Sequence, residues 1–198
     1  HGFKGFMDYG MFPRLARAVA GAGCRVHRFN FSHSGMTRDA STFARPELFE
    51  RDTWTRQVED LAAIATAVAD GRLEGGDRPL VLVGHSRGGE LVAEAAILDD
   101  TLGTGYRIDA VVGLSPTTDG YALDGTDTAA YLTLYGSQDE DLTGFSGTVK
   151  EAFRAYDDAG TEGTTTCNAP PCIALAPPFE KNLVHIYGAE HAGLIGDA

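Results

Sequence analysis

The sequence is short of basic residues and of long apolar runs, and each shortage removes a class of function. Lysine and arginine number 16 against 28 acidic residues, so the formal net charge is −12. This surplus of negative charge repels phosphate backbones, so we expect no nucleic-acid partner. No segment approaches the roughly 18 to 20 consecutive apolar residues that a membrane-spanning helix needs, so we expect no insertion into a membrane.

Cysteine is also scarce, with three in the chain, and no histidine or second cysteine pair lies near Cys167 and Cys172 to complete a metal site. These two cysteines bracket four residues of a loop-like stretch, where they either close a small disulfide ring or remain unpaired thiols. A disulfide would indicate an oxidising compartment and favours a secreted or extracytoplasmic location. Cys24 precedes an apolar segment and is predicted to be a buried thiol.

The patterns that are present describe one α/β domain over residues 1–198. A length of 198 residues, 43% of them hydrophobic and 22% charged, is enough for a single buried core. Strand-like and helix-like runs alternate, which is typical of a parallel sheet with crossover helices. We expect strands at 24–31, 80–83, 108–114, 129–135 and 183–187, and helices at 11–21, 53–69, 88–98 and 147–159. The stretch 160–178 is predicted to be irregular.

Residues 84–88 read Gly-His-Ser-Arg-Gly, a G-x-S-x-G pattern between the apolar run 80–83 and a predicted helix. In this setting a sharp strand-to-helix turn holds the serine in strained backbone angles and lifts its hydroxyl clear of the sheet. The helix that starts behind Ser86 directs its positive end towards developing negative charge. The pattern predicts Ser86 as a nucleophile; the alternative is a glycine-rich turn with a surface serine.

The strand, the GHSRGG segment and the following helix resemble the nucleophile elbow of the α/β-hydrolase superfamily, and the N-terminal HGFKG resembles its oxyanion loop. The resemblance runs from His1 to His191 and is closest to bacterial esterases of the dienelactone-hydrolase-like and polyester-hydrolase-like branches. A dienelactone hydrolase proper carries cysteine as its nucleophile, so Ser86 favours ordinary ester hydrolysis. The resemblance implies the α/β-hydrolase fold, with a mostly parallel sheet and helices on both faces.

The resemblance also assigns the base and the acid of a Ser-His-Asp triad. His191 follows the last predicted strand and matches the family's late histidine loop, so it is expected to be the base; the alternative is a surface histidine. The acid is expected after strand 129–135, where the sequence looks like the family's G-x-x-D turn and selects Asp139, with Asp141 as its competitor. The other histidines are weaker candidates for the base: His1, His27, His33, His85 and His185.

Two backbone N–H groups are expected to form the oxyanion hole. Arg87 follows the nucleophile and supplies one donor by position. The family's second donor follows the His-Gly pair, which places it at Phe3. The alternative is that residues 1–3 are only a stray chain end.

The same resemblance bears on the extent of the chain and on access to the site. In this family strands precede the oxyanion loop, so we expect the N-terminal strands to be missing and further sequence to exist upstream of His1. Between residues 114 and 129 there are too few residues for the family's helical lid. An open site of this kind suits short acyl esters or a polymer surface.

These features predict a serine hydrolase that cleaves carboxylic esters through an acyl-enzyme intermediate and needs no metal or organic cofactor. Its expected partner is a small-molecule or polymeric ester. The same triad also serves acyltransferases, thioesterases and amidases, which the sequence does not separate from esterases. A catalytically silent binding module on the same scaffold is the remaining alternative.

Overall fold

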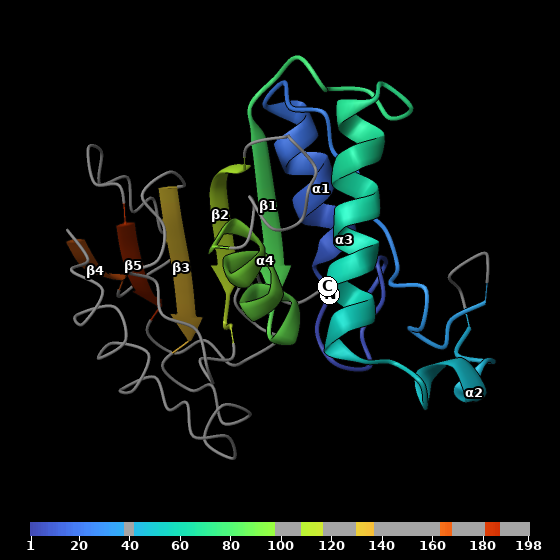
Figure 1. Ribbon diagram of the computed structural model, residues 1–198. Coiled ribbons are helices and arrows are strands. Elements are labelled where there is room, and N and C mark those ends of the chain that lie inside the picture. The colour runs from blue at the N-terminus through green and yellow to red at the C-terminus, as the bar shows by residue number, and fades with distance from the viewer. Residues whose placement is uncertain (38–41, 98–107, 117–129, 137–162, 168–180, 187–198) are drawn as a thin grey trace.

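The computed structural model (Figure 1) describes residues 1–37, 42–97, 108–116, 130–136, 163–167 and 181–186. Its centre is a five-stranded sheet in which every neighbouring pair is parallel. The strands lie in the order β1 (Leu80–His85), β2 (Ile108–Leu114), β3 (Ala130–Gly136), β5 (Lys181–Ile186) and β4 (Gly163–Cys167). The described helices are α1 (Phe12–Gly21), α2 (Pro46–Phe49), α3 (Trp54–Ala69) and α4 (Arg87–Ile97). The parallel α/β arrangement confirms the predicted fold class.

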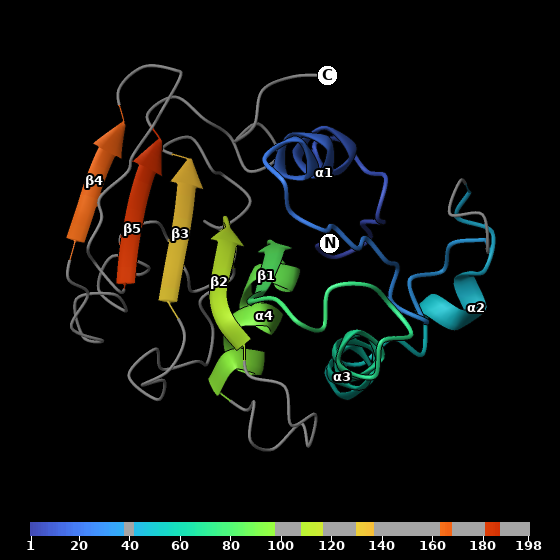
Figure 2. The ribbon, with the colours of Figure 1, turned by 90° about the horizontal axis from the view of Figure 1, so that it is seen from above.

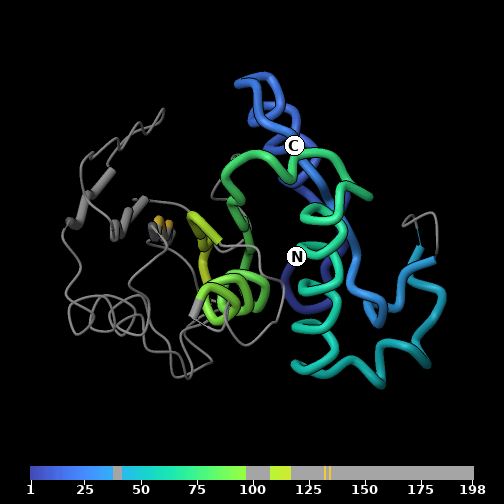
Figure 3. Tube along the Cα trace, turned by 45° about the horizontal axis from the view of Figure 1, so that its top comes forward, coloured from blue at the N-terminus to red at the C-terminus, as the bar shows by residue number. Residues whose placement is uncertain are grey.

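Local sequence explains where the longest helix begins and which side it buries. Thr53 caps α3, and its hydroxyl oxygen accepts a hydrogen bond of 3.3 Å from the Arg56 N–H. Leu61, Ala65 and Val68 recur at helical spacing and are buried. Residues 70–79 then arch from the end of α3 to the start of β1 (Figure 3). The predicted helices at 11–21, 53–69 and 88–98 are confirmed over their described residues, while 147–159 lies outside the described residues.

Helices cover both faces of the sheet, as Figure 2 shows with α1 on one side and α3 and α4 on the other. Successive residues of β2 point to opposite faces, and they join separate apolar clusters. Val111 packs with Leu91 of α4 and Leu61 of α3, whereas Val112 packs against a cluster centred on Met11 and Leu114. The sheet is therefore the middle of three layers, and the larger of the two apolar clusters lies between the sheet and the helices α3 and α4.

The predicted strand at 24–31 is wrong, because this segment is not hydrogen-bonded to the sheet. Its polar side chains bind elsewhere: Arg25 pairs with Glu74 at 2.7 Å, and His27 donates from Nε2 to the Glu74 carbonyl oxygen, also at 2.7 Å. Arg28 pairs with Asp8. These contacts hold the segment to the 74–75 turn and to the N-terminal loop rather than to a neighbouring strand. Cys24 at its start is exposed, not buried as expected.

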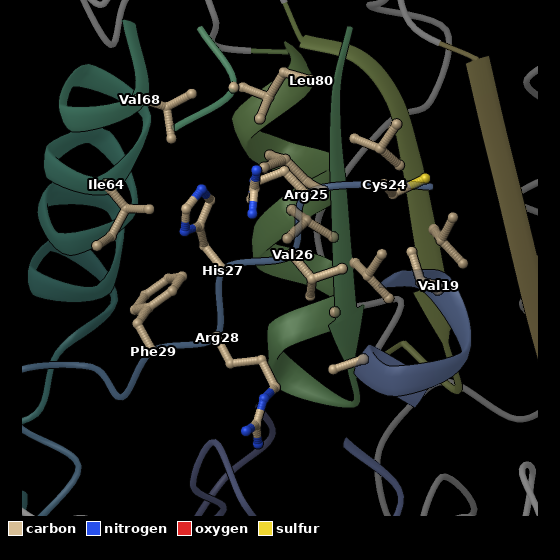
Figure 4. Close-up of a pocket in the computed structure, with 18 of the residues that line it drawn as sticks. Val19, Cys24, Arg25, Val26, His27, Arg28, Phe29, Ile64, Val68 and Leu80 are labelled. Carbon is tan, nitrogen blue, oxygen red and sulfur yellow. The ribbon is translucent and has the colours of Figure 1, made fainter. Parts of the chain in front are cut away.

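A cavity of about 670 Å³ lies between this segment and β1. Figure 4 shows its walls, with Val26 and Phe29 from the segment, Ile64 and Val68 from α3, and Leu80 from β1. On β1, Val81 and Val83 also line it, and both remain exposed. The cavity therefore lies between the segment and the edge of β1 that is unpaired among the described strands.

The prediction of an irregular stretch at 160–178 is also wrong in part. Residues 163–167 form β4, which pairs with β5 in parallel. Three consecutive threonines stand in this strand, and β-branched residues favour extended structure. Cys167 ends β4, while Cys172 and the predicted disulfide fall outside the described residues. The sequence predicts no helical lid between residues 114 and 129, and the structure describes this region only as far as residue 116.

Candidate active site

Ser86 stands alone between the last residue of β1 and the first residue of α4. Its φ is +55°, in the left-handed region that side chains disfavour. The turn is held from both sides, because the Ser86 N–H donates to the Leu114 carbonyl of β2 at 2.9 Å and the Ser86 carbonyl accepts from the Gly89 N–H at 2.8 Å. This is the strand-to-helix turn that the sequence pattern predicts.

The glycines around Ser86 are required by close backbone approach. A β-carbon on Gly84 would collide with the Gly88 carbonyl group, and one on Gly89 would come within 2.8 Å of the Pro116 side chain. One on Gly88 would lie 2.6 Å from the His1 carbonyl oxygen. The turn is therefore packed against the N-terminal loop as well as against β2.

The N-terminal loop lies directly on the nucleophile. A β-carbon added to Gly2 would be 2.8 Å from the Ser86 Cβ and 3.3 Å from its Oγ. The loop bends tightly at this point, since the Gly2 carbonyl accepts from the Gly5 N–H at 3.0 Å and Lys4 has a φ of +56°. Residues 1 and 2 thus lie against the turn at Ser86. The next residue, Phe3, has 60% of its surface exposed.

The His1 ring holds the N-terminal loop against residue 31. The Phe31 N–H donates to His1 Nε2 at 3.3 Å, so that nitrogen carries no proton. His1 Nδ1 lies 3.0 Å from the Gly2 carbonyl oxygen, which only accepts, so the proton is on Nδ1. The ring also packs edge-on against Phe31 at a centroid distance of 4.7 Å. The His1 ring therefore ties the N-terminal loop to residue 31.

Strained residues gather at this edge of the sheet. Among the described residues, the non-glycine positions with positive φ are Lys4, Ser86 and Ser115. Ser115 follows β2, is fully buried, and donates its N–H to the Leu134 carbonyl of β3 at 2.7 Å. Such backbone strain is typical of functional sites, where the surrounding structure enforces it. Sequence reasoning missed Ser115, because no pattern marks it.

The side chain of Arg87 turns towards the N-terminus of α3. Its guanidinium carbon lies 5.5 Å from the centroid of the Trp54 ring. Nearby, Gln57 donates from Nε2 to Asp52 Oδ2 at 2.6 Å. Burial raises the pKa of the Asp52 carboxyl, while the Gln57 hydrogen bond and the Arg87 charge offset part of this rise. Sequence reasoning assigns no functional role to Asp52, Trp54 or Gln57.

Three phenylalanines form an apolar cluster beside the N-terminal loop. The Phe3 ring lies 5.3 Å from that of Phe49, which in turn lies 5.6 Å from Phe43. Phe3 and Phe43 are both exposed. We call Phe3, Phe43 and Phe49 the aromatic rim. Phe3 directly follows Gly2, which lies against Ser86.

The remaining predicted members of the triad are not placed. His191, Asp139 and its competitor Asp141 lie outside the described residues. Of the weaker histidine candidates, His85 packs against Phe12 of α1 with its ring centroid 6.3 Å away. His33 lies 2.7 Å from the Ser32 hydroxyl, and the fold puts His185 on β5.

The described residues contain no group of three or more histidine, cysteine or acidic side chains that could hold a metal ion. Likewise, none of the helices in the described ranges is both long and apolar enough to cross a membrane.

Comparisons with known proteins agree with the fold. A family model described as "Alpha/beta hydrolase family" matches residues 1–189. Among solved structures, a dienelactone hydrolase-like promiscuous phosphotriesterase from metagenomic libraries is similar, with a TM-score of 0.52 and 15% identity. The match covers 97% of this chain and 69% of that one, and at this identity it concerns the fold alone. A search of the curated proteins finds no match.

Proposed function

Because the chain belongs to the alpha/beta hydrolase family, we propose that it is a serine esterase that cleaves carboxylic esters through an acyl-enzyme intermediate. The observation that carries this proposal is the position of Ser86, strained at φ +55° between β1 and α4 with the N-terminal loop against it. A serine in this position presents its hydroxyl to solvent at the carboxyl edge of a parallel sheet.

In the proposed reaction His191 removes the proton from the Ser86 hydroxyl as its oxygen attacks the ester carbonyl carbon. The same histidine then gives that proton to the departing alcohol. Water repeats the sequence on the acyl-enzyme: His191 takes a proton from water, the acid is released, and the proton returns to Ser86. Asp139 orients the imidazole and stabilises its cation.

The tetrahedral intermediate needs donors for its oxyanion, and we propose the N–H groups of Arg87 and Phe3. Arg87 opens α4, so its N–H has no acceptor within the helix. The Ser86 N–H, by contrast, is already bound to the Leu114 carbonyl. The positive end of α4 adds to this stabilisation. The contact of Gly2 with Ser86 supports placing the second donor, on Phe3, at the same point.

The surroundings of Ser86 favour an apolar, uncharged or cationic ester over a polyanion. The aromatic rim offers exposed apolar surface to an acyl chain or an aromatic alcohol. The net charge of −12 disfavours an anionic substrate. Short p-nitrophenyl esters meet both conditions.

The test is turnover of p-nitrophenyl esters of rising acyl length by the wild type and Ser86→Ala. We expect preference for short chains and a loss of about 10⁴-fold or more in kcat for the variant. Labelling of the native wild type, but not Ser86→Ala, by a fluorophosphonate probe is the matching chemical result. A wild type that neither labels nor turns over would mean a silent binding module, and competing alcohols or amines would reveal acyl transfer.

A further inference from the structure

The side chain of Arg87, the first residue of α4, makes a contact with the neighbouring helix α3. Its guanidinium lies over Trp54, the first residue of α3, 5.5 Å from the ring centroid. The helices α3 and α4 also pack against each other through Leu61 and Leu91 in the main core. The residue after the nucleophile is therefore anchored on a neighbouring helix, at a distance in sequence of about thirty residues.

A buried polar pair lies beside this anchor. Gln57 follows Trp54 by three positions, so both side chains lie on the same face of α3. Gln57 is only 4% exposed and donates to Asp52 Oδ2 at 2.6 Å. Burial raises the pKa of the Asp52 carboxyl, and the Arg87 charge opposes part of that rise. The cation over Trp54 and the Gln57–Asp52 pair therefore both lie at the N-terminal end of α3.

Three atoms of these side chains are chemically complementary. Within the described part of the chain, Asp52 Oδ1, Gln57 Oε1 and Arg87 Nε are buried without a hydrogen-bond partner. Two of them are acceptors and the third is a donor. Leaving such groups buried and unpaired is unfavourable, so a side-chain rotation that lets Arg87 Nε–H donate to one of the two oxygens would be favoured.

We propose that Asp52, Trp54 and Gln57 form a clamp on the Arg87 side chain, and that this clamp fixes the peptide N–H that follows Ser86. The proposal rests on the proposed function, in which that N–H stabilises the oxyanion. Asp52, Trp54 and Gln57 are then positioning residues, since they act through Arg87 and do not touch the ester. The clamp sets the direction of the donor, so its loss slows the chemical step without weakening substrate binding.

The test uses Gln57→Leu, which keeps the volume but removes both the Oε1 acceptor and the Nε2 donor to Asp52, and Gln57→Glu, which sets a second carboxylate against Asp52 Oδ2. With p-nitrophenyl acetate we expect both variants to lose about 10-fold in kcat with KM unchanged. Glu59→Leu, a polar-to-apolar change at an exposed position of the same helix, is the matched control and should keep wild-type kcat.

A second variant guards against a misfolded Gln57→Leu. Arg87→Lys keeps the charge but lacks the planar Nε–H, so it should show the same fall in kcat at constant KM. Wild-type kcat in both Gln57→Leu and Arg87→Lys would overturn the clamp while leaving the esterase intact. A rise in KM confined to an anionic ester, such as a succinyl monoester, would overturn it in favour of direct substrate binding by Arg87. If the wild type neither labels with a fluorophosphonate nor turns over, the proposed function fails and the clamp fails with it.

Discussion

Gly2 and Ser86 are in contact, although 84 positions separate them in the sequence. A β-carbon on Gly2 would come within 2.8 Å of the Ser86 Cβ and 3.3 Å of its Oγ. No side chain fits between them. The loop that the resemblance assigns to the oxyanion hole thus approaches the nucleophile too closely for a side chain at position 2.

Adding a single methyl group at this contact should separate the loop from the nucleophile. We expect Gly2→Ala to lower kcat on p-nitrophenyl acetate by about 100-fold, since a displacement near 1 Å is enough for such a loss. Gly21→Ala is the matched control, because a β-carbon at Gly21 meets no atom within 4 Å. Equal activity in the two variants would show that the N-terminal loop takes no part in the reaction.

The backbone strain at Ser86 can be measured through stability. Ser86→Ala keeps a side chain at φ +55°, whereas Ser86→Gly does not. We expect the glycine variant to have a free energy of unfolding about 1 kcal/mol higher than the alanine variant, measured by urea denaturation. Both should be inactive. The reverse order of stabilities would argue that the left-handed turn does not persist in solution.

The choice between the two candidate acids is open to a paired substitution. We expect Asp139→Asn to reduce kcat by about 10⁴-fold, because the histidine loses its orienting carboxylate. Asp141→Asn should stay close to the wild type. Steady-state kinetics of both variants decide the assignment, and a large loss in Asp141→Asn alone would transfer the role to Asp141.

Asp52 makes the stability of the protein depend on pH. Its pKa in the folded chain is raised above the ordinary value of 3.8, chiefly by burial. The folded state therefore holds this proton more tightly than the unfolded chain, and the resulting stability is fully present below pH 3.8 and is lost as the pH rises through the raised value.

Asp52→Asn carries no titrating proton at this position. The free energy of unfolding of this variant minus that of the wild type should increase as the pH rises from 3.8 through the raised pKa of Asp52, and it should stay level at higher pH. Asp77→Asn makes the same change of charge at an exposed position and serves as the control. A constant offset between Asp52→Asn and the wild type from pH 3 to pH 8 would contradict the raised pKa.

Local patterns predicted the parts of the fold that depend on neighbouring residues. The turn at Ser86 follows from small residues between an apolar run and a helix, and α3 follows from its cap at Thr53 and its apolar spacing. The predicted strand at 24–31 failed for the opposite reason. Its apolar alternation is real, but Glu74 and Asp8 bind its arginines, and they are distant in sequence.

The clamp on Arg87 was beyond sequence reasoning for a similar reason. Asp52, Trp54 and Gln57 are ordinary residues at the start of a helix, and only the packing of α3 on α4 brings the Arg87 side chain over Trp54 at that end of the helix. The strand β4 is different, because its run of threonines was a usable signal of extended structure. Glycines at 160 and 163 and prolines at 170 and 171 border this run and favour irregular structure, which conceals the signal.

The free edge of β1 also affects how the protein should be handled. In the described part of the sheet β1 pairs only with β2, and its other side borders the cavity lined by Val81 and Val83. An open strand edge of this kind is a template on which another extended chain can add hydrogen bonds. Concentrated or aged samples should therefore self-associate, which makes dilute, freshly purified material the right choice for kinetics.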